Sequence, residues 1–239
     1  MIIFDRVTKK YDGQVGIEDV SINIDKGDFV FLVGPSGAGK STFIKLILKE
    51  IDADSGKIIV DGQEVTSMLS REIPYYRRKT GMVFQDFRLL PKKTVFENVA
   101  FAMEVVHKSK KQIKKQVGYM LELVGIADKA DKYPDELSAG EQQRVAIARA
   151  IINKPTVLIA DEPTGNLDPE TAKDIMALLE EINSRGTTIV MVTHAKDIVD
   201  RMHKRVIAIE NGHVVSDKTG KYEYYKTIGG MRINANDII

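Results

Sequence analysis

The chain of 239 residues contains no cysteine. It can therefore form no disulfide, no thiolate zinc site and no thiol nucleophile, which excludes these sources of stability and catalysis. The absence is compatible with a reducing compartment, and the cytosol is the location that we expect.

The sequence also lacks an excess of either charge and a long apolar run. Lys and Arg total 35 against 34 Asp and Glu, so the net charge of +1 gives no field that would steer the chain to nucleic acid or anionic lipid. No apolar run approaches the roughly 20 residues of a bilayer-spanning helix, and residues 1–7 begin a strand pattern without a signal-like segment. We expect no nucleic-acid partner and no segment that spans a membrane.

The most informative feature that is present is a phosphate-binding pattern. It consists of Gly34, Pro35, Ser36, Gly37, Ala38, Gly39, Lys40 and Ser41, followed by Thr42. The pattern fits G-x-x-x-x-G-K-[ST], and it lies between a predicted buried strand over 29–33 and a predicted helix over 42–48. An ordinary glycine-rich turn does not explain these flanks, and the glycine spacing does not fit the dinucleotide pattern G-x-G-x-x-G. The sequence therefore predicts a nucleoside triphosphate site.

Each residue type in this loop has a physical role. Glycines let successive backbone N–H groups point at phosphate oxygens, and the helix N-terminus adds a positive dipole. We expect Lys40 to reach the β and γ phosphates and the Ser41 hydroxyl to bind Mg²⁺.

The remaining patterns predict one α/β domain over residues 1–239. Alternating residues 20–25 and the segment 56–62 indicate antiparallel strands, whereas the continuous apolar runs 156–160 and 187–192 are typical of parallel strands covered on both faces. Between them, about residues 86–152 have a helical character and form a predicted insertion. Asn211-Gly212 predicts a hairpin turn, and we treat about 222–239 as a C-terminal tail.

Two local patterns support the helical insertion. Thr94 and Glu97 form a predicted capping box, in which the two side chains bond each other's backbone N–H groups at a helix start. The lysine-rich segment 108–115 is interpreted as a solvated helix face in preference to a site for an acidic partner.

An acidic pair follows the predicted strand 157–160. Asp161 could hold Mg²⁺ through water, and Glu162 could polarise an attacking water, which makes hydrolysis plausible. The structural alternative is that the pair caps a helix beginning near Pro163.

The segment Leu137 to Arg144 discriminates best among phosphate-loop proteins. Ser138 and Glu141 satisfy the S-x-x-E capping box, which is a purely structural explanation. That explanation leaves out the small residue Ala139 and the glycine Gly140, which keep the helix N-terminus open for an anion.

Together these motifs resemble the nucleotide-binding subunit of ATP-binding cassette (ABC) proteins over nearly the whole chain. The resemblance implies a P-loop NTPase fold of the ABC ATPase type, with a RecA-like parallel-sheet core, an N-terminal antiparallel β subdomain and an inserted α-helical subdomain. It implies ATP and Mg²⁺ as ligands and Mg²⁺-dependent ATP hydrolysis. It also implies a homodimer, in which Ser138, Gly140 and Glu141 of one copy grip the γ-phosphate held by the other.

The same resemblance assigns four further residues, each with a structural alternative. Tyr11 is similar to the aromatic residue that stacks on adenine, which is a weak signal by itself. Gln85 resembles the glutamine that touches Mg²⁺ and the attacking water, although a buried structural glutamine is an equal alternative. Asp168 belongs to a loop at the dimer interface, where Asn166 replaces the frequent serine, and it could equally cap a helix. His194 resembles the histidine that bonds the γ-phosphate, whereas a lone histidine at a strand end is usually structural.

The segment 84–91 is more apolar than a loop should be, either because it packs in the core or because it binds a partner helix. With residues 161–168 it resembles the cell-division branch of the family. That branch implies a polytopic membrane partner contacting the region around Phe87, Arg88, Leu89 and Leu90, and a location at the inner face of the cell membrane. The alternative is a lipoprotein-release or export ATPase.

Other classes fit less well. A soluble ABC ATPase would need a long insertion between Gln85 and Ser138, and a GTPase would need an [NT]-K-x-D motif; the sequence has neither. A nucleotide sensor that does not hydrolyse ATP normally lacks the residue corresponding to Glu162.

Overall fold

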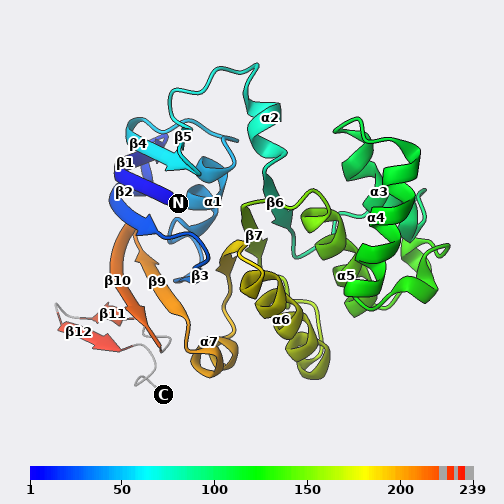
Figure 1. The fold of residues 1–239 in the computed structure, drawn as a ribbon. Coiled ribbons are helices and arrows are strands. Elements are labelled where there is room, and N and C mark those ends of the chain that lie inside the picture. The colour runs from blue at the N-terminus through cyan, green and yellow to red at the C-terminus, as the bar shows by residue number, and fades with distance from the viewer. Residues whose placement is uncertain (221–224, 229–230, 235–239) are drawn as a thin grey trace. The chain divides into compact units, whose positions relative to one another are not determined.

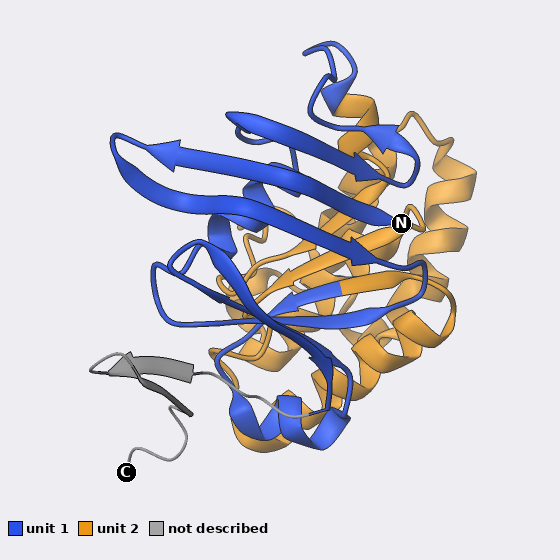
Figure 2. Cartoon of the chain, turned by 90° about the vertical axis from the view of Figure 1, so that its left-hand side faces the viewer, with its two compact units in different colours: residues 1–73, 190–239 blue, residues 74–189 orange. Residues whose placement is uncertain are grey.

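The computed structural model describes residues 1–220, 225–228 and 231–234, with side chains placed for residues 1–220. The chain divides into two compact units, which Figure 2 colours separately. Unit 1 comprises residues 1–73 and 190–239, and unit 2 comprises residues 74–189. The predicted tail over 222–239 lies largely outside the described residues.

Unit 1 contains most of the strands (Figure 1). Its elements are β1 (Ile2–Tyr11), β2 (Gln14–Ile24), β3 (Phe29–Val33), α1 (Lys40–Ile47), β4 (Ser55–Val60), β5 (Gln63–Glu64), α7 (Lys196–Met202), β9 (Arg205–Glu210), β10 (His213–Thr219), β11 (Tyr225–Ile228) and β12 (Met231–Asn234). Helix α2 (Ile73–Arg77) and strand β8 (Thr188–Val192) each cross a boundary between the units.

The N-terminal sheet has the order β2-β1-β4-β5 and is antiparallel, as the sequence predicts. Ile2 of β1 pairs with Ile24 of β2 on one side and with Val60 of β4 on the other. In β2 the residues Val20, Ile22 and Ile24 are buried and those between them are exposed, because side chains alternate between the two faces of a sheet. The buried face packs on α1, where the rings of Phe4 and Phe43 stack with centroids 4.3 Å apart.

The second group of strands in unit 1 contains the predicted parallel pairing. Every residue of β3 is buried, and β3 pairs with β9 in parallel. Strand β10 then returns antiparallel to β9. Asn211 and Gly212 at the turn have φ of 49° and 82°, the left-handed values that a two-residue hairpin turn needs. The predicted Asn-Gly hairpin is confirmed.

Unit 2 combines a parallel strand pair with most of the helices. Its elements are β6 (Thr80–Val83), α3 (Val95–Glu104), α4 (Lys110–Leu123), the short 3₁₀ helices η1 (Ala127–Lys129) and η2 (Pro134–Glu136), α5 (Ala139–Ile151), β7 (Val157–Asp161) and α6 (Pro169–Ser184). Strands β6 and β7 are parallel. The fully described segment 86–152 contains helices and no strand, in agreement with its predicted helical character.

Sequence signals set where these helices begin. Thr94 and Glu97 form the predicted capping box of α3. Ser109 and Gln112 form another at α4, whose lysines are exposed while Ile113 is buried. The lysine-rich segment is therefore a solvated helix face, as predicted.

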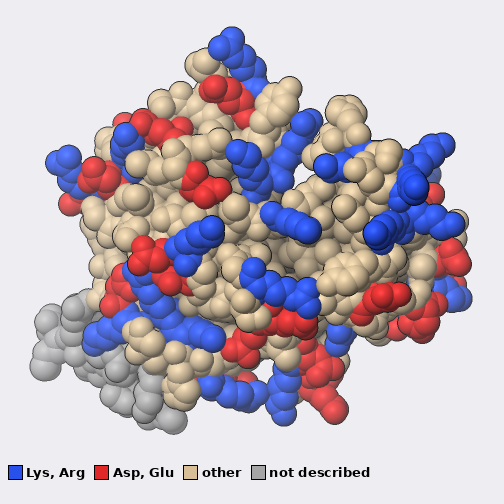
Figure 3. Space-filling view, in the orientation of Figure 1, with Lys and Arg blue, Asp and Glu red and all other residues tan. Residues whose placement is uncertain are grey.

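Charges of both signs are interspersed over the face seen in Figure 3, consistent with the small net charge. Within the part of the chain that the structure describes, no helix is both long enough and apolar enough to cross a bilayer.

Candidate active site

The phosphate loop of unit 1 follows β3 and leads into α1 (Figure 1). Gly34 and Gly39 have φ of 146° and 112°, and a Cβ atom on either would overlap a backbone carbonyl oxygen, that of Ile209 or of Gly16. Only glycine fits both the backbone conformation and the space at these two positions. Strands β9 and β2 therefore fix the path of the loop.

Lys40 is the first residue of α1 and is buried. Its Nζ donates hydrogen bonds of 2.8 Å to the carbonyl oxygens of Gly34 and Pro35, which lie at the start of the loop. Gly39, at the N-cap of α1, provides no side-chain cap, and the first turn holds no acidic residue. The helix N-terminus, the buried cation and the glycine backbone together suit an anionic ligand.

The predicted adenine-stacking residue lies beside this loop. Tyr11, at the end of β1, is 39% exposed, and its hydroxyl accepts a hydrogen bond of 3.5 Å from Thr42 Oγ1. Both residues line a pocket of about 210 Å³ together with residues 14–16 and 37–41. Residues 14–16 were not among the predicted site residues. Their signal is the Asp12-Gly13 turn, which brings the start of β2 back beside Tyr11.

In unit 2 the acidic pair stands at the end of β7. Asp161 is the last residue of the strand, and Glu162 follows in a left-handed conformation with φ of 47°. Residues 162–167 form turns, and the next helix, α6, begins only at Pro169. The alternative that the pair caps a helix near Pro163 is therefore wrong.

Gln85 contacts the loop that follows Glu162. Its Nε2 lies 3.5 Å from Asn166 Oδ1, and Asn166 Nδ2 donates a 3.0 Å hydrogen bond to the backbone oxygen of Gln85. The Gln85 side chain is exposed, so the interpretation as a buried structural glutamine is wrong.

The buried glutamine is instead Gln143 on α5, which sequence reasoning missed. It has no solvent exposure, and its Nε2 donates a 2.8 Å hydrogen bond to the backbone oxygen of Pro163. Its Oε1 has no hydrogen-bond partner among the described residues. Gln143 thus fixes the backbone directly after Glu162.

Ser138 and Glu141 form the predicted capping box at the start of α5. Ser138 Oγ accepts from the Glu141 N–H, and the Ser138 N–H donates to Glu141 Oε2, which confirms the capping box. The Ser138 N–H also holds the pKa of the Glu141 carboxyl below its ordinary value. Gly140 is buried, and a Cβ there would overlap the side chain of Thr171 on α6. Packing therefore explains Gly140, while Ser138 and Ala139 stay exposed.

Asp168 caps α6 by accepting hydrogen bonds from the N–H groups of Glu170 and Thr171. Hydrogen bonds from Thr171 and Glu170 hold the pKa of its carboxyl below the ordinary value. The structural alternative for Asp168, a helix cap, is therefore confirmed. His194 follows β8 and is exposed, so it does not belong to the core.

Phe87, Leu89 and Leu90 are half-buried, and no residue of the segment 84–90 reaches the core. The interpretation of this apolar segment as core packing is therefore wrong. Its carbonyl groups are held by Arg149, which was also absent from the predicted site residues.

The predicted site residues divide between the units. Tyr11, the phosphate loop 34–42 and His194 belong to unit 1, and the structure brings Tyr11 and the loop together. Gln85, the segment 138–141, the acidic pair and Asp168 belong to unit 2, where Asn166 joins Gln85 to the turn after Glu162. Among the described residues no cluster of three or more acidic or histidine side chains could hold a metal alone. The predicted metal ligands Ser41, Gln85 and Asp161 are oxygen donors, which suits Mg²⁺ completed by phosphate and water.

Comparison with known proteins agrees with this arrangement. A family model described as ABC transporter matches residues 17–165. The chain is 55% identical over 227 residues to the cell division ATP-binding protein FtsE of Bacillus subtilis (strain 168), covering 94% of this chain and 100% of that protein. It is 44% identical over 215 residues to FtsE of Escherichia coli (strain K12), covering 90% and 97%.

The fold matches that of a solved ATP-binding cassette, a dimer in a post-hydrolysis state bound to ADP and Pi, with a TM-score of 0.84. The sequences are 34% identical over 93% of this chain and 100% of the cassette. The parallel core strands and the antiparallel N-terminal sheet are those of the ABC ATPase fold, as predicted. The chain therefore belongs to the ABC transporter family, as an ATP-binding subunit that hydrolyses ATP.

Proposed function

We propose that this chain is an FtsE-type ATPase that couples ATP-driven closure of a homodimer to an FtsX-like membrane protein, which controls peptidoglycan hydrolysis in cell division. The similarity to proteins named FtsE over at least 90% of the chain supports the branch. The cassette with a matching fold is a dimer, which supports the assembly.

The phosphate loop binds the phosphates of ATP, and Lys40 provides a positive charge beside them. The loop N–H groups cradle the phosphates, and the Lys40 ammonium stabilises the charge that develops on them during transfer. Tyr11 provides the aromatic face for adenine. Ser41, Gln85 and Asp161 would hold Mg²⁺, which neutralises phosphate charge when bound.

Hydrolysis needs a base beside the attacking water. We assign this role to Glu162, whose carboxylate accepts the proton of that water, with Gln85 orienting it. His194 donates a hydrogen bond to the γ-phosphate. The second copy contributes Ser138, Gly140 and Asp168, and the exposed Ser138 at the start of α5 supports this contact.

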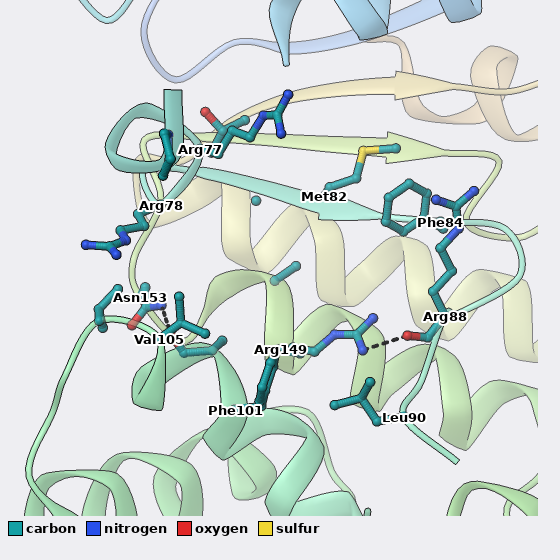
Figure 4. A pocket seen from close by; sticks show the side chains of 16 residues that line it. Arg77, Arg78, Met82, Phe84, Arg88, Leu90, Phe101, Val105, Arg149 and Asn153 are labelled. Atoms are coloured by element: carbon teal, nitrogen blue, oxygen red, sulfur yellow. Dashed lines mark hydrogen bonds between the residues drawn. The ribbon is translucent and has the colours of Figure 1, made fainter. Parts of the chain in front are cut away.

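The observation that supports the membrane partner most is a groove in unit 2, shown in Figure 4. It has a volume of about 510 Å³ and apolar walls that include Phe84, Leu90, Phe101 and Val105. Phe101 and Val105 are 41% and 43% exposed, which is unusual for large apolar side chains on one helix face. An amphipathic helix laid in the groove would cover them.

Charge adds a second requirement on the partner. Four arginines, Arg77, Arg78, Arg88 and Arg149, line the groove, and no acidic residue does. The apolar walls with cationic groups fit a helix that carries carboxylates beside its apolar face. Asn98, fully buried on α3, bonds both the N–H and the carbonyl oxygen of Leu90 and so fixes this wall. The partner thus places the chain at the inner face of the cell membrane.

A photo-activated cross-linking residue at position 89 or 101, introduced in cells, tests this proposal. Covalent capture of an FtsX-like protein is expected, because both positions face or adjoin the groove. A residue at 119 serves as the matched control, since Tyr119 is 57% exposed on α4 of the same unit but does not line the groove.

Capture of a lipoprotein-release or export permease would assign the chain to the alternative branch, the lipoprotein-release or export ATPases. Equal capture from position 119 would contradict the groove as the docking site.

A further inference from the structure

The chain turns sharply just after Gln85. Phe87 and Arg88 have φ of 57° and 48°, so two successive residues with side chains adopt the left-handed conformation. The Arg88 N–H donates to the backbone oxygen of Asp86 at 2.6 Å, which closes the turn. Residues 84–90 include no glycine or asparagine, the residues that adopt this conformation most readily. The conformation must therefore be held by contacts from elsewhere.

Arg149, in the last turn of α5, provides such contacts. Its Nη1 donates a 2.7 Å hydrogen bond to the backbone oxygen of Arg88, and its Nη2 donates a 2.9 Å hydrogen bond to that of Phe87. Figure 4 shows the guanidinium directed at this segment. The planar fork of a guanidinium presents two N–H groups to two neighbouring acceptors in a fixed geometry, so less conformational freedom is lost per hydrogen bond than with the flexible ammonium of a lysine.

Arg149 has no ion pair among the described residues. Burial lowers the pKa of its guanidinium, because no carboxylate compensates the loss of water. The carbonyl oxygens of Phe87 and Arg88 thus stabilise the cation, and the cation in turn stabilises the strained turn. On the other side of the turn, Asn166 holds the backbone oxygen of Gln85.

We infer that Arg149 is a positioning residue, which fixes the backbone turn at Phe87 and Arg88 and thereby the place of Gln85 in the catalytic site. The second part rests on the proposed role of Gln85. The inference distinguishes Arg149 from Arg144 on the same helix, whose guanidinium donates to the Val124 carbonyl oxygen and pairs with Asp174.

The experiment compares Arg149→Met, Arg149→Lys and the matched control Arg144→Met in the full chain. Amide hydrogen exchange over residues 86–90 and steady-state ATP hydrolysis are measured. In Arg149→Met we expect these amides to exchange about tenfold faster, because local opening becomes easier. We expect kcat to fall about tenfold or more with KM for ATP within about twofold, because the reacting groups are misplaced while phosphate binding is retained.

Arg149→Lys should restore little of either property, and Arg144→Met should leave the amides of 86–90 unchanged. Unchanged exchange in Arg149→Met, or the same change in Arg144→Met, would overturn the inference.

A second substitution, at Arg88, distinguishes the effect of the strained turn on kcat from the effect of losing the Arg149 cation. Glycine adopts the left-handed conformation without a steric penalty, whereas alanine does not. Arg149→Met with Arg88→Gly should therefore recover kcat better than Arg149→Met with Arg88→Ala, although both lose the same side chain. Equal recovery with alanine would overturn the inference.

Gln85→Ala distinguishes this inference from the proposed function. If Gln85→Ala lowers kcat and Arg149→Met does not, Arg149 is not a positioning residue. If exchange over 86–90 responds to Arg149→Met but neither variant changes kcat, the turn is positioned as inferred and the proposed role of Gln85 is wrong.

Discussion

The phosphate loop of unit 1 and the loops of unit 2 hold their backbones in different ways. In the phosphate loop, the path is set by the absence of side chains, because a Cβ on Gly34 or Gly39 would overlap a carbonyl oxygen. In unit 2 the paths are set by side chains that donate to backbone oxygens, as Gln143 does to Pro163 and Arg149 does to Phe87 and Arg88.

The difference predicts how each region responds to substitution. In the phosphate loop an added Cβ at position 34 or 39 would overlap a backbone carbonyl oxygen, so a substitution there should displace the loop. Where a side-chain donor holds the loop, removing the donor should lower stability by the free energy of the lost hydrogen bond. The size of this loss depends on which side chain replaces the donor. Three predictions test this comparison.

Gly39→Ala should have the largest effect. The added methyl group meets the Gly16 carbonyl oxygen, so the loop must move and the phosphates are misplaced. We expect turnover to fall about a hundredfold or more, measured by phosphate release, with weaker binding of a fluorescent ATP analogue.

Gly27→Ala is the matched control, because Gly27 also has a positive φ, of 84°, but open space around it. It should be only mildly destabilised and should retain turnover. If Gly39→Ala behaves like Gly27→Ala, space does not limit the phosphate loop.

Gln143 should show an intermediate and graded effect on stability, measured by chemical denaturation. Gln143→Met should cost about 1 kcal/mol, because it leaves the Pro163 oxygen without its donor but also removes an Oε1 that has no partner among the described residues. Gln143→Glu should cost about 3 kcal/mol at neutral pH, because a buried carboxylate would face that oxygen. This loss should shrink at low pH, where the raised pKa of the buried carboxyl keeps it protonated.

Gln142→Met is the control, since Gln142 bonds the Leu137 oxygen from a half-buried position. Gln142→Met should cost less than Gln143→Met, and an equal loss in these two variants would contradict the buried donor of Gln143 as the source of the effect. An equal loss in the Met and Glu variants of Gln143 would contradict the added cost of a buried carboxylate.

Ser138 should show a small effect on stability, no larger than that of Gln143→Met, and a selective effect on activity. Ser138→Ala and Ser109→Ala each remove the cap of a helix with a capping box, and each should cost about 1 kcal/mol. Only Ser138→Ala should lower ATP turnover, by about tenfold, because in the proposed dimer its hydroxyl also contacts the γ-phosphate held by the second copy. Equal turnover in both variants would make Ser138 a cap alone and remove the proposed contact between copies.

The same contrast explains how much the sequence could predict. The phosphate loop was predictable from a local pattern because glycine is the one residue that fits positions 34 and 39. The Asn-Gly hairpin and the capping boxes were predictable for the same kind of local reason. Half-exposed and fully buried strands could be told apart because apolar residues alternate in the first kind and are continuous in the second, as the burial of β2 and β3 shows.

The donors of unit 2 were not predicted, because Gln and Arg are common on exposed helix faces and their partners are distant in sequence. One signal existed for Gln143: it shares the buried face of α5 with Gly140, Ile147 and Ile151 at helical spacing. Nothing comparable identified Arg149, whose function depends on carbonyl groups about 60 residues earlier in the chain.

The Lys40 side chain spans the loop from which it emerges, with its ammonium on the Gly34 and Pro35 oxygens. The loop is thus preorganised by its own cation, so little conformational entropy remains to be lost when phosphates enter. A Lys40→Ala variant consequently removes two things together, the charge that we propose contacts the phosphate and the two hydrogen bonds that hold the loop. A loss of nucleotide binding in this variant would therefore have two physical causes, lost electrostatic attraction and a less ordered loop.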